Sequence, residues 1–158
     1  MCNHEPKDLD ALASRTEVVP AVNQVELHPY FARPALRAAD ARHGIITQAW
    51  SPIGGVNVYQ PANPAHVKNP LQDAVITALA EKRRKTPAQV ILRWQLQLGN
   101  SAIPRSVRPQ RIRENFEVFD FQLTDEEVAA IDAPDTGVRG GPDPRPGDTG
   151  MFPFTIDN

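Results

Sequence analysis

Three short apolar runs, separated by stretches with helical periodicity, set the pattern of this chain. Residues 20–27 and 45–50 have the β-rich composition of strands, and a third apolar run begins at Ala102 and stops at Pro104. Between and around these runs, apolar residues recur at helical spacing. We therefore expect helices over residues 5–15, 33–43, 71–85, from 87 through the sequence VILRWQLQL, within the amphipathic stretch after Pro104, and over 128–132.

Signals for helix boundaries support these ranges. Thr86 and Thr124 each begin a capping-box sequence, in which the residue three positions later returns a hydrogen bond to the cap. Pro34 stands at a helix start, and Gly44 follows a helix end. Trp94 lies among aliphatic residues of its helix, so we expect it in the core.

The order of elements is that of a parallel α/β protein. Strand and helix alternate through about three and a half βα units, and the polar candidate residues come just after strands. Residues 56–70 show no period and predict a loop. We expect one domain over residues 1–135, followed by an irregular tail over 136–158, where prolines and glycines are frequent.

Composition narrows the range of partners. The chain has 158 residues and a net charge of −2, and its basic residues are not gathered in tails, so neither nucleic acid nor an anionic membrane is an expected partner. No apolar run approaches the roughly 20 residues that cross a bilayer. The single cysteine, Cys2, excludes an internal disulfide, and the polar first residues are unlike a secretory signal, which indicates a cytoplasmic protein. No histidine has a metal-ligand spacing from Cys2, so no metal is expected.

The residues that follow the third apolar run combine the features of an anion site. Arg105 and Ser106 come directly after Pro104, and four arginines fall within residues 105–113. Backbone N–H groups at a helix N-terminus, a hydroxyl group and guanidinium groups together suit a phosphate ester. Arginines on a helix also commonly form an ordinary solvated face, so the pattern alone leaves both interpretations open.

Longer motifs resemble the aldo-keto reductases, and in particular the bacterial diketogluconate-reductase-like members. The order I-P-R-S-V, then R, then E-N, then V-F-D-F resembles the nucleotide-binding end of that family, where I-P-K-S closes the last barrel strand. The sequences V-N-Q-V-E-x-H-P-Y and A-W-S-P-I-G resemble two further strand ends of the family. The resemblance extends from Asn3 to about Asp135 and implies NADP(H) as the cofactor.

At the adenosine end, the resemblance implies a grip on the 2′-phosphate of NADPH. Arg111 matches the arginine that holds this phosphate and covers the adenine. Arg105 stands where the family usually has lysine, a change that keeps the charge and adds a planar fork suited to phosphate. Glu114 and Asn115 match the E-N pair that lies near the adenine amino group in that family. The implied residues are Arg105, Ser106, Val107, Arg111, Glu114 and Asn115.

At the nicotinamide end, the resemblance implies a second group of residues. Asn3 and Gln24 would hold the carboxamide, and Trp50 would stack on the ring. Gln24 is also explained by the ordinary need of a buried amide for partners. Ser51 would touch the pyrophosphate at a turn with paired glycines. The implied residues are Asn3, Gln24, Trp50, Ser51, Ile53 and Gly54.

The implied fold class is α/β, of the parallel (β/α)8 TIM-barrel type, and we expect the C-terminal part only, about strands six to eight with their helices. On that interpretation the family's tyrosine, lysine, aspartate and histidine of catalysis lie outside the chain, so no catalytic residue is assigned. Tyr30 belongs to the H-P-Y motif and not to the catalytic set. A truncated gene product, or a gene model begun at an internal methionine, would give such a chain.

The predicted function is NADP-dependent reduction of small aldehydes, ketones or keto sugars by hydride transfer from NADPH. The alternative is a noncatalytic NADP-binding module, or a pseudoenzyme subunit that pairs with another chain. The expected partner is a small carbonyl substrate. Open strand edges of an incomplete barrel would also favour self-association.

Overall fold

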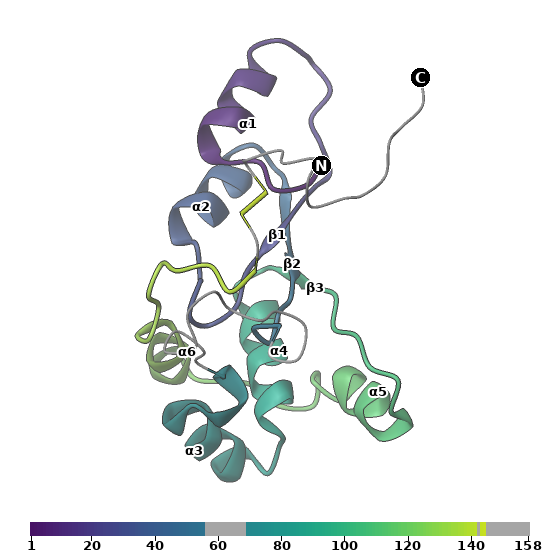
Figure 1. The fold of residues 1–158 in the computed structure, drawn as a ribbon, viewed down its shortest axis with the longest axis vertical. Coiled ribbons are helices and arrows are strands. Elements are labelled where there is room, and N and C mark those ends of the chain that lie inside the picture. The colour runs from purple at the N-terminus through teal and green to yellow at the C-terminus, as the bar shows by residue number, and fades with distance from the viewer. Residues whose placement is uncertain (56–68, 142, 145–158) are drawn as a thin grey trace.

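A computed structural model describes residues 1–55, 69–141 and 143–144 of the chain. Three strands form one parallel sheet in the order β1-β2-β3, with helices in the connections between them (Figure 1). Most of the loop predicted over residues 56–70 lies outside the described residues. The elements are α1 (Pro6–Ala13), β1 (Val22–Glu26), α2 (Pro34–Arg42), β2 (Ile46–Trp50), η2 (Pro70–Gln72), α3 (Ala74–Arg83), α4 (Pro87–Gln97), β3 (Ser101–Ala102), α5 (Pro109–Phe116) and α6 (Asp125–Asp132).

The sheet is built mainly from β1 and β2. They pair in parallel along their whole length, whereas β3 adds only two residues beside β2. On the other side of β1, Cys2 makes a single parallel bridge to Gln24. Helices α1 and α2 lie toward one end of the molecule, α3, α4 and α6 gather at the other, and α5 stands to the side beyond β3 (Figure 1).

The predicted barrel must be corrected. We expected a parallel (β/α)8 TIM-barrel type represented by its C-terminal part only, about strands six to eight, and that prediction does not hold as stated. The described residues form an open sheet of three parallel strands, the last of them two residues long. Local periodicity identifies each βα unit, but the place of a unit in a barrel depends on strands that pair with it from elsewhere, which the local pattern does not specify.

The structure confirms both predicted capping boxes. Thr86 Oγ1 accepts from the Gln89 N–H at 3.3 Å, and Gln89 Oε1 accepts from the Thr86 N–H at 2.9 Å. Thr124 and Glu127 repeat this exchange at 3.3 and 2.9 Å, so α6 begins directly after Thr124 and earlier than the expected residue 128. No helix among the described residues is long and apolar enough to span a membrane.

The main core lies between the sheet and helices α3, α4 and α6. Val25 of β1 and Leu27, which directly follows that strand, are fully buried together with Trp94 of α4. The Trp94 indole N–H donates to Asp132 Oδ1 at 3.0 Å, which satisfies the one polar group of that side chain. Trp94 therefore lies in the core, as predicted, and connects α4 to α6.

A buried polar network joins β1, α2 and β2. Asp40 of α2 is fully buried, and its carboxylate accepts from Asn23 Nδ2 at 3.1 Å and from Thr47 Oγ1 at 2.7 Å. Asn23 Nδ2 also donates to the backbone carbonyl of His4 at 3.0 Å. Buried polar groups are costly unless they are paired, so this network fixes the N-terminal segment and α2 against the sheet.

A carboxylate on α6 supports the packing of α6 against α3. Glu127 accepts from Arg83 Nη2 at 2.6 Å and from Lys82 Nζ at 2.8 Å, and its side chain is 7% exposed. Burial raises the pKa of Glu127, but the hydrogen bonds from Arg83 and Lys82 outweigh burial and bring the pKa from 4.5 to about 2. The charged form of Glu127 is therefore the form that the folded chain favours.

We expect Glu127→Gln to lower the free energy of unfolding at pH 7 by roughly 1.5–3 kcal/mol, the range for a hydrogen bond to a charged group. The folded-state pKa is depressed, so this contribution is present above pH 4.5 and is lost as the pH falls toward 2. Urea unfolding followed by circular dichroism at both ends of that range measures it. Glu81→Gln, at an exposed carboxylate of α3, is the matched control and should change little. An equal loss in both variants would show that the Glu127 contacts add no stability.

We also expect the chain to self-associate in solution. Among the described residues β3 is an edge strand, and Phe116 and Phe119, which line the same groove as Ala102 of β3, are 73% and 71% exposed. Contiguous exposed apolar patches usually mark association. Sedimentation velocity over a concentration series should show oligomers, and replacing both phenylalanines by serine should reduce them. A monomer at every concentration would contradict this expectation.

Candidate functional site

A chain of side-chain hydrogen bonds crosses all three strands. Gln24 Nε2 donates to Gln48 Oε1 at 2.7 Å, and Gln48 Nε2 donates to Ser101 Oγ at 3.2 Å. The three residues are register partners, so their side chains share one face of the sheet. Sequence reasoning missed Gln48. The available signal was its position two residues before Trp50, on the same face of the strand.

Trp50 ends β2 on this same face. Its indole N–H donates to Asn3 Oδ1 at 3.0 Å, and the Asn3 backbone N–H donates to the Gln24 carbonyl at 2.9 Å. Asn3 has a positive φ of 56°, a conformation that asparagine adopts more readily than most residues. The structure thus brings together Asn3, Gln24 and Trp50, three of the residues predicted at the nicotinamide end.

The turn after β2 contains the other predicted residues of this group. Ser51 and Gly54 have positive φ angles of 48° and 85°, and the Gly54 N–H donates to the Ser51 carbonyl at 2.8 Å. The Ile53 side chain packs against the main core. Ile53 therefore anchors the turn to the core.

Glu26 is a second residue that sequence reasoning missed. It stands opposite Trp50 in the register and is fully buried. Its carboxylate accepts from Arg139 Nη1 at 3.1 Å, from the backbone N–H groups of Gly140 and Gly141 at 2.7 and 2.8 Å, and lies 3.2 Å from the His28 ring. Burial raises the pKa of Glu26, but the hydrogen bonds from His28, Gly141 and Gly140 lower it by more, so the net pKa lies below its ordinary value. The carboxylate is therefore ionised near neutral pH.

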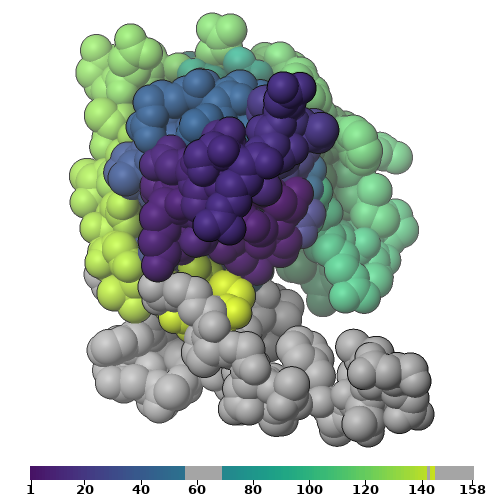
Figure 2. All heavy atoms as spheres, turned by 90° about the horizontal axis from the view of Figure 1, so that it is seen from above, coloured from purple at the N-terminus to yellow at the C-terminus, as the bar shows by residue number. Residues whose placement is uncertain are grey.

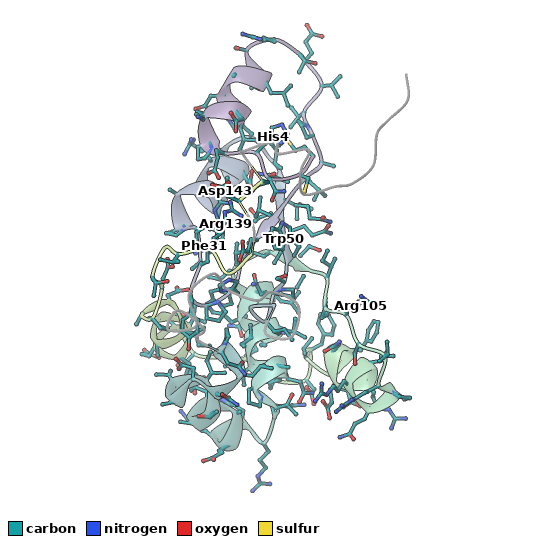
Figure 3. The ribbon with its side chains drawn as sticks, in the orientation of Figure 1. His4, Phe31, Trp50, Arg105, Arg139 and Asp143 are labelled. Atoms are coloured by element: carbon teal, nitrogen blue, oxygen red, sulfur yellow. The ribbon has the colours of Figure 1, made fainter. Side chains whose placement is uncertain are left out.

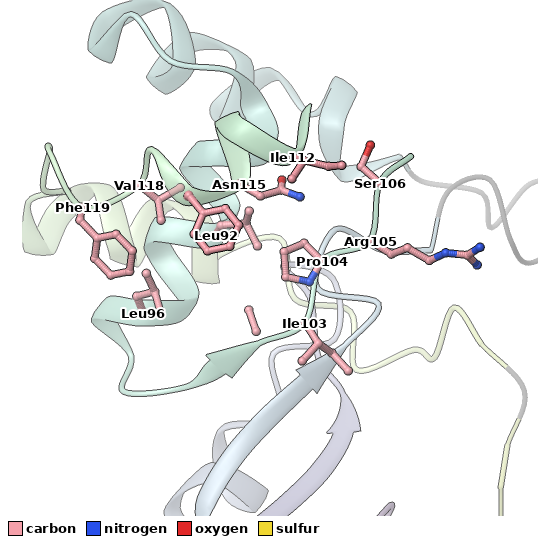
Figure 4. A pocket seen from close by; sticks show the side chains of 12 residues that line it. Leu92, Leu96, Ile103, Pro104, Arg105, Ser106, Ile112, Asn115, Val118 and Phe119 are labelled. Carbon is pink, nitrogen blue, oxygen red and sulfur yellow. The ribbon is translucent and has the colours of Figure 1, made fainter. Parts of the chain in front are cut away.

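A groove of about 600 Å³ lies between α4, α5 and the segment that leaves β3 (Figure 4). Apolar side chains, among them Leu92, Ile112 and Phe116, form most of its wall. Two of the predicted adenosine-end residues, Ser106 and Asn115, line it as well. The Arg105 side chain belongs to the same lining but extends away from the apolar wall (Figure 4).

The other residues predicted at the adenosine end do not line this groove. Val107 is 83% exposed, and Glu114 Oε1 accepts from Gln110 Nε2 at 2.8 Å along α5. The guanidinium groups of Arg105 and Arg111 are exposed and make no ion pair with any residue that the structure describes. Helix α5 begins without a side-chain cap. Its first N–H groups and two cations are thus available to an anion.

The two groups of residues lie in different parts of the structure. Trp50 is near the middle of the molecule, and Arg105 is far to the side in the segment toward α5 (Figure 3). The hydrogen bond from Gln48 to Ser101 links the face of Trp50 to the strand that leads to Arg105. A ligand that contacts both groups must be extended. Within residues 1–55, 69–141 and 143–144, no cluster of three His, Cys, Asp or Glu side chains could hold a metal ion.

Comparisons with known proteins find relatives over nearly the whole chain. Morphine 6-dehydrogenase of Pseudomonas putida is 53% identical over 153 residues, which are 96% of this chain and 52% of that protein. Methylglyoxal reductase DkgA of Yersinia pestis is 44% identical over 92% of this chain and 49% of its own length. The crystal structure of a Bombyx mori aldo-keto reductase in complex with NADP is similar with a TM-score of 0.81 and 36% identity, over 89% of this chain and 45% of that one.

The comparisons also bear on the fold. The chain spans about half the length of the relatives that it matches. They support a partial barrel with three parallel strands, and not the predicted restriction to strands six to eight. The model of the aldo/keto reductase family matches residues 1–135. The chain therefore belongs to the aldo/keto reductase family.

Proposed function

We propose that this chain provides the NADP(H)-binding surface of an oxidoreductase that reduces small aldehydes, ketones or keto sugars by hydride transfer. The observation that carries the proposal is the arrangement of Asn3, Gln24 and Trp50 on one face. Arg105 before α5 and Arg111 in its first turn are exposed and make no ion pair with the part of the chain that the structure describes. A dinucleotide has the extended shape that contact with both groups requires. A similar structure was crystallised with NADP, which supports the choice of cofactor.

At the nicotinamide end, the side chains of Asn3, Gln24 and Trp50 would orient the nicotinamide ring. The Trp50 indole is held by Asn3, and stacking on the nicotinamide is the contact that an aromatic ring would provide. The amide N–H of Gln24 donates to Gln48. The carbonyl oxygen of Gln24 would then accept a hydrogen bond from the carboxamide N–H of the nicotinamide. When bound, NADPH supplies the hydride. The residues of this chain fix the plane of the ring and supply no electrons.

At the adenosine end, Arg105 and Arg111 would recognise the charge of a phosphate group. Arg105 and Arg111 are exposed and unpaired within the described residues, so binding a phosphate would not break an existing ion pair. Two guanidinium groups near uncapped helix N–H groups suit the doubly charged 2′-phosphate that NADPH has and NADH lacks.

Proton transfer is not assigned to this chain. Tyr30 OH donates to Asp73 Oδ2 at 2.8 Å. Burial raises the pKa of Tyr30, and the hydrogen bond and charge of Asp73 raise it further. A general acid for the forming alkoxide needs a pKa nearer the working pH, so Tyr30 is tuned in the wrong direction. This observation also favours the alternative function, a noncatalytic NADP-binding subunit whose partner supplies the acid.

We expect the chain to bind NADPH more tightly than NADH, and Arg111→Ala to remove most of that preference. Losing a charge-assisted contact costs roughly 1.5–3 kcal/mol, or more than tenfold in affinity. Titration calorimetry with both nucleotides measures the preference. Arg113→Ala, the same change further along α5, is the matched control and should retain it. Equal affinities for NADPH and NADH in the unmutated chain would contradict the proposed phosphate site.

We expect the purified chain alone to oxidise no NADPH in the presence of carbonyl compounds. A missing general acid alone costs about 10²–10⁴-fold in rate. Absorbance of NADPH with a panel of aldehydes and ketones tests this. Substrate-dependent oxidation that Trp50→Ala abolishes would show that the chain contains an acid other than Tyr30.

A further inference from the structure

The segment from Thr136 to Gly141 lies across the ends of β1 and β2 and is held there at several points. At its start, the Thr136 N–H and Oγ1 both donate to the Tyr30 carbonyl, at 3.1 and 3.0 Å. Near its end, the two glycine N–H groups and the Arg139 guanidinium donate to Glu26. Arg139 also lies over the Phe31 ring at 5.2 Å. We call residues 136–141 the strap.

The strap is fastened to a carboxylate that is fully buried. Leaving the Glu26 charge in the interior without donors would be costly, and the strap supplies three of its hydrogen bonds. Arg139 also forms an ion pair with Glu5, in which Arg139 Nη2 lies 3.8 Å from Glu5 Oε1. In the space-filling view, the C-terminal residues of the described chain (yellow) border the N-terminal residues (purple), as these contacts require (Figure 2).

The end of the strap meets the Trp50 ring directly. A Cβ atom at Gly141 would lie 2.9 Å from Trp50 Cη2, closer than Cβ atoms approach other atoms, and 3.1 Å from Cζ3, which is also tight. The same atom would lie 3.3 Å from Glu26 Oε2. Glycine is therefore required at this position for the strap to reach Glu26 while the indole keeps its place. Asn3 holds the N–H side of the indole, and Gly141 abuts its benzo edge.

We propose that Glu26 and Gly141 are positioning residues, and that the strap which Glu26 holds fixes the orientation of the Trp50 indole. This inference rests on the proposed function insofar as the indole receives the nicotinamide ring. The strap closes one edge of the indole, so a ligand would stack on a ring that is already fixed from two sides. Such pre-organisation lowers the entropy cost of binding.

The test uses the full chain without nucleotide, so that it does not depend on NADPH binding. The chain has two tryptophans, Trp50 and the buried Trp94. In a Trp94→Phe background, fluorescence reports on Trp50 alone. Quenching by acrylamide is compared for Glu26→Gln, Gly141→Ala and the control Val138→Ala, which changes an exposed side chain of the strap.

We expect stronger quenching of Trp50 in Glu26→Gln and Gly141→Ala, with Val138→Ala like the parent. Loss of a charge-assisted contact should raise the population with a released strap by about tenfold. Unchanged quenching in both variants, with the far-ultraviolet circular dichroism of the parent, would overturn the proposal. If the Trp94→Phe chain does not fold, fluorine-labelled tryptophan in the unmutated background gives the same comparison, with the Trp50 resonance assigned by its loss in Trp50→Phe.

A second arm separates this inference from the proposed function. NADPH is titrated into the parent and all three variants. Weaker NADPH binding in Glu26→Gln and Gly141→Ala than in Val138→Ala would support the role of the strap in ligand binding. A parent chain that does not bind NADPH would overturn the proposed function, while the quenching result would still decide whether the strap fixes the indole.

Discussion

Backbone hydrogen bonds between β1 and β2 place Gln24 beside Gln48 and Glu26 beside Trp50, and most of the candidate site follows from those two juxtapositions. Successive side chains of a strand alternate between faces, so all four residues lie on one face and the buried Val25 on the other. A slip of one residue would exchange the faces and place the amides in the core. The core packing of Val25, Leu27 and Trp94 thus also maintains the site.

Local features of the structure were predictable from the sequence. The caps at Thr86 and Thr124 act within four residues, so their sequence signature was sufficient to predict both capping boxes, although the last helix was expected to begin at residue 128 and begins at Asp125. The burial of Trp94 was predictable because aliphatic residues such as Val90, Ile91 and Leu98 occupy the same helix face. Both kinds of inference use only residues close in sequence.

Distant contacts were not predictable in the same way. Glu26 and Arg139 are 113 positions apart, and nothing in either local sequence indicates the other. The strap belongs to the segment that the sequence suggested was an irregular tail, because proline and glycine indicate the absence of a helix or strand but do not indicate what the backbone contacts. The proposed boundary after residue 135 therefore separates Glu26 from the residues that satisfy it. The place of the strands in a barrel likewise depends on pairing with distant parts of the chain, so local motifs did not determine it.

The chain of hydrogen bonds from Gln24 through Gln48 to Ser101 has a direction. Each amide donates toward β3, so the last oxygen at the β1 end is left as an acceptor. Neither amide can reverse on its own, because reversal of Gln24 would place two carbonyl oxygens face to face and reversal of Gln48 would place two N–H groups face to face. All three groups can reverse together, since the Ser101 hydroxyl is able to donate as well as accept. The β1 end would then present a donor, so the polarity that a ligand meets at Gln24 is set by a group two strands away.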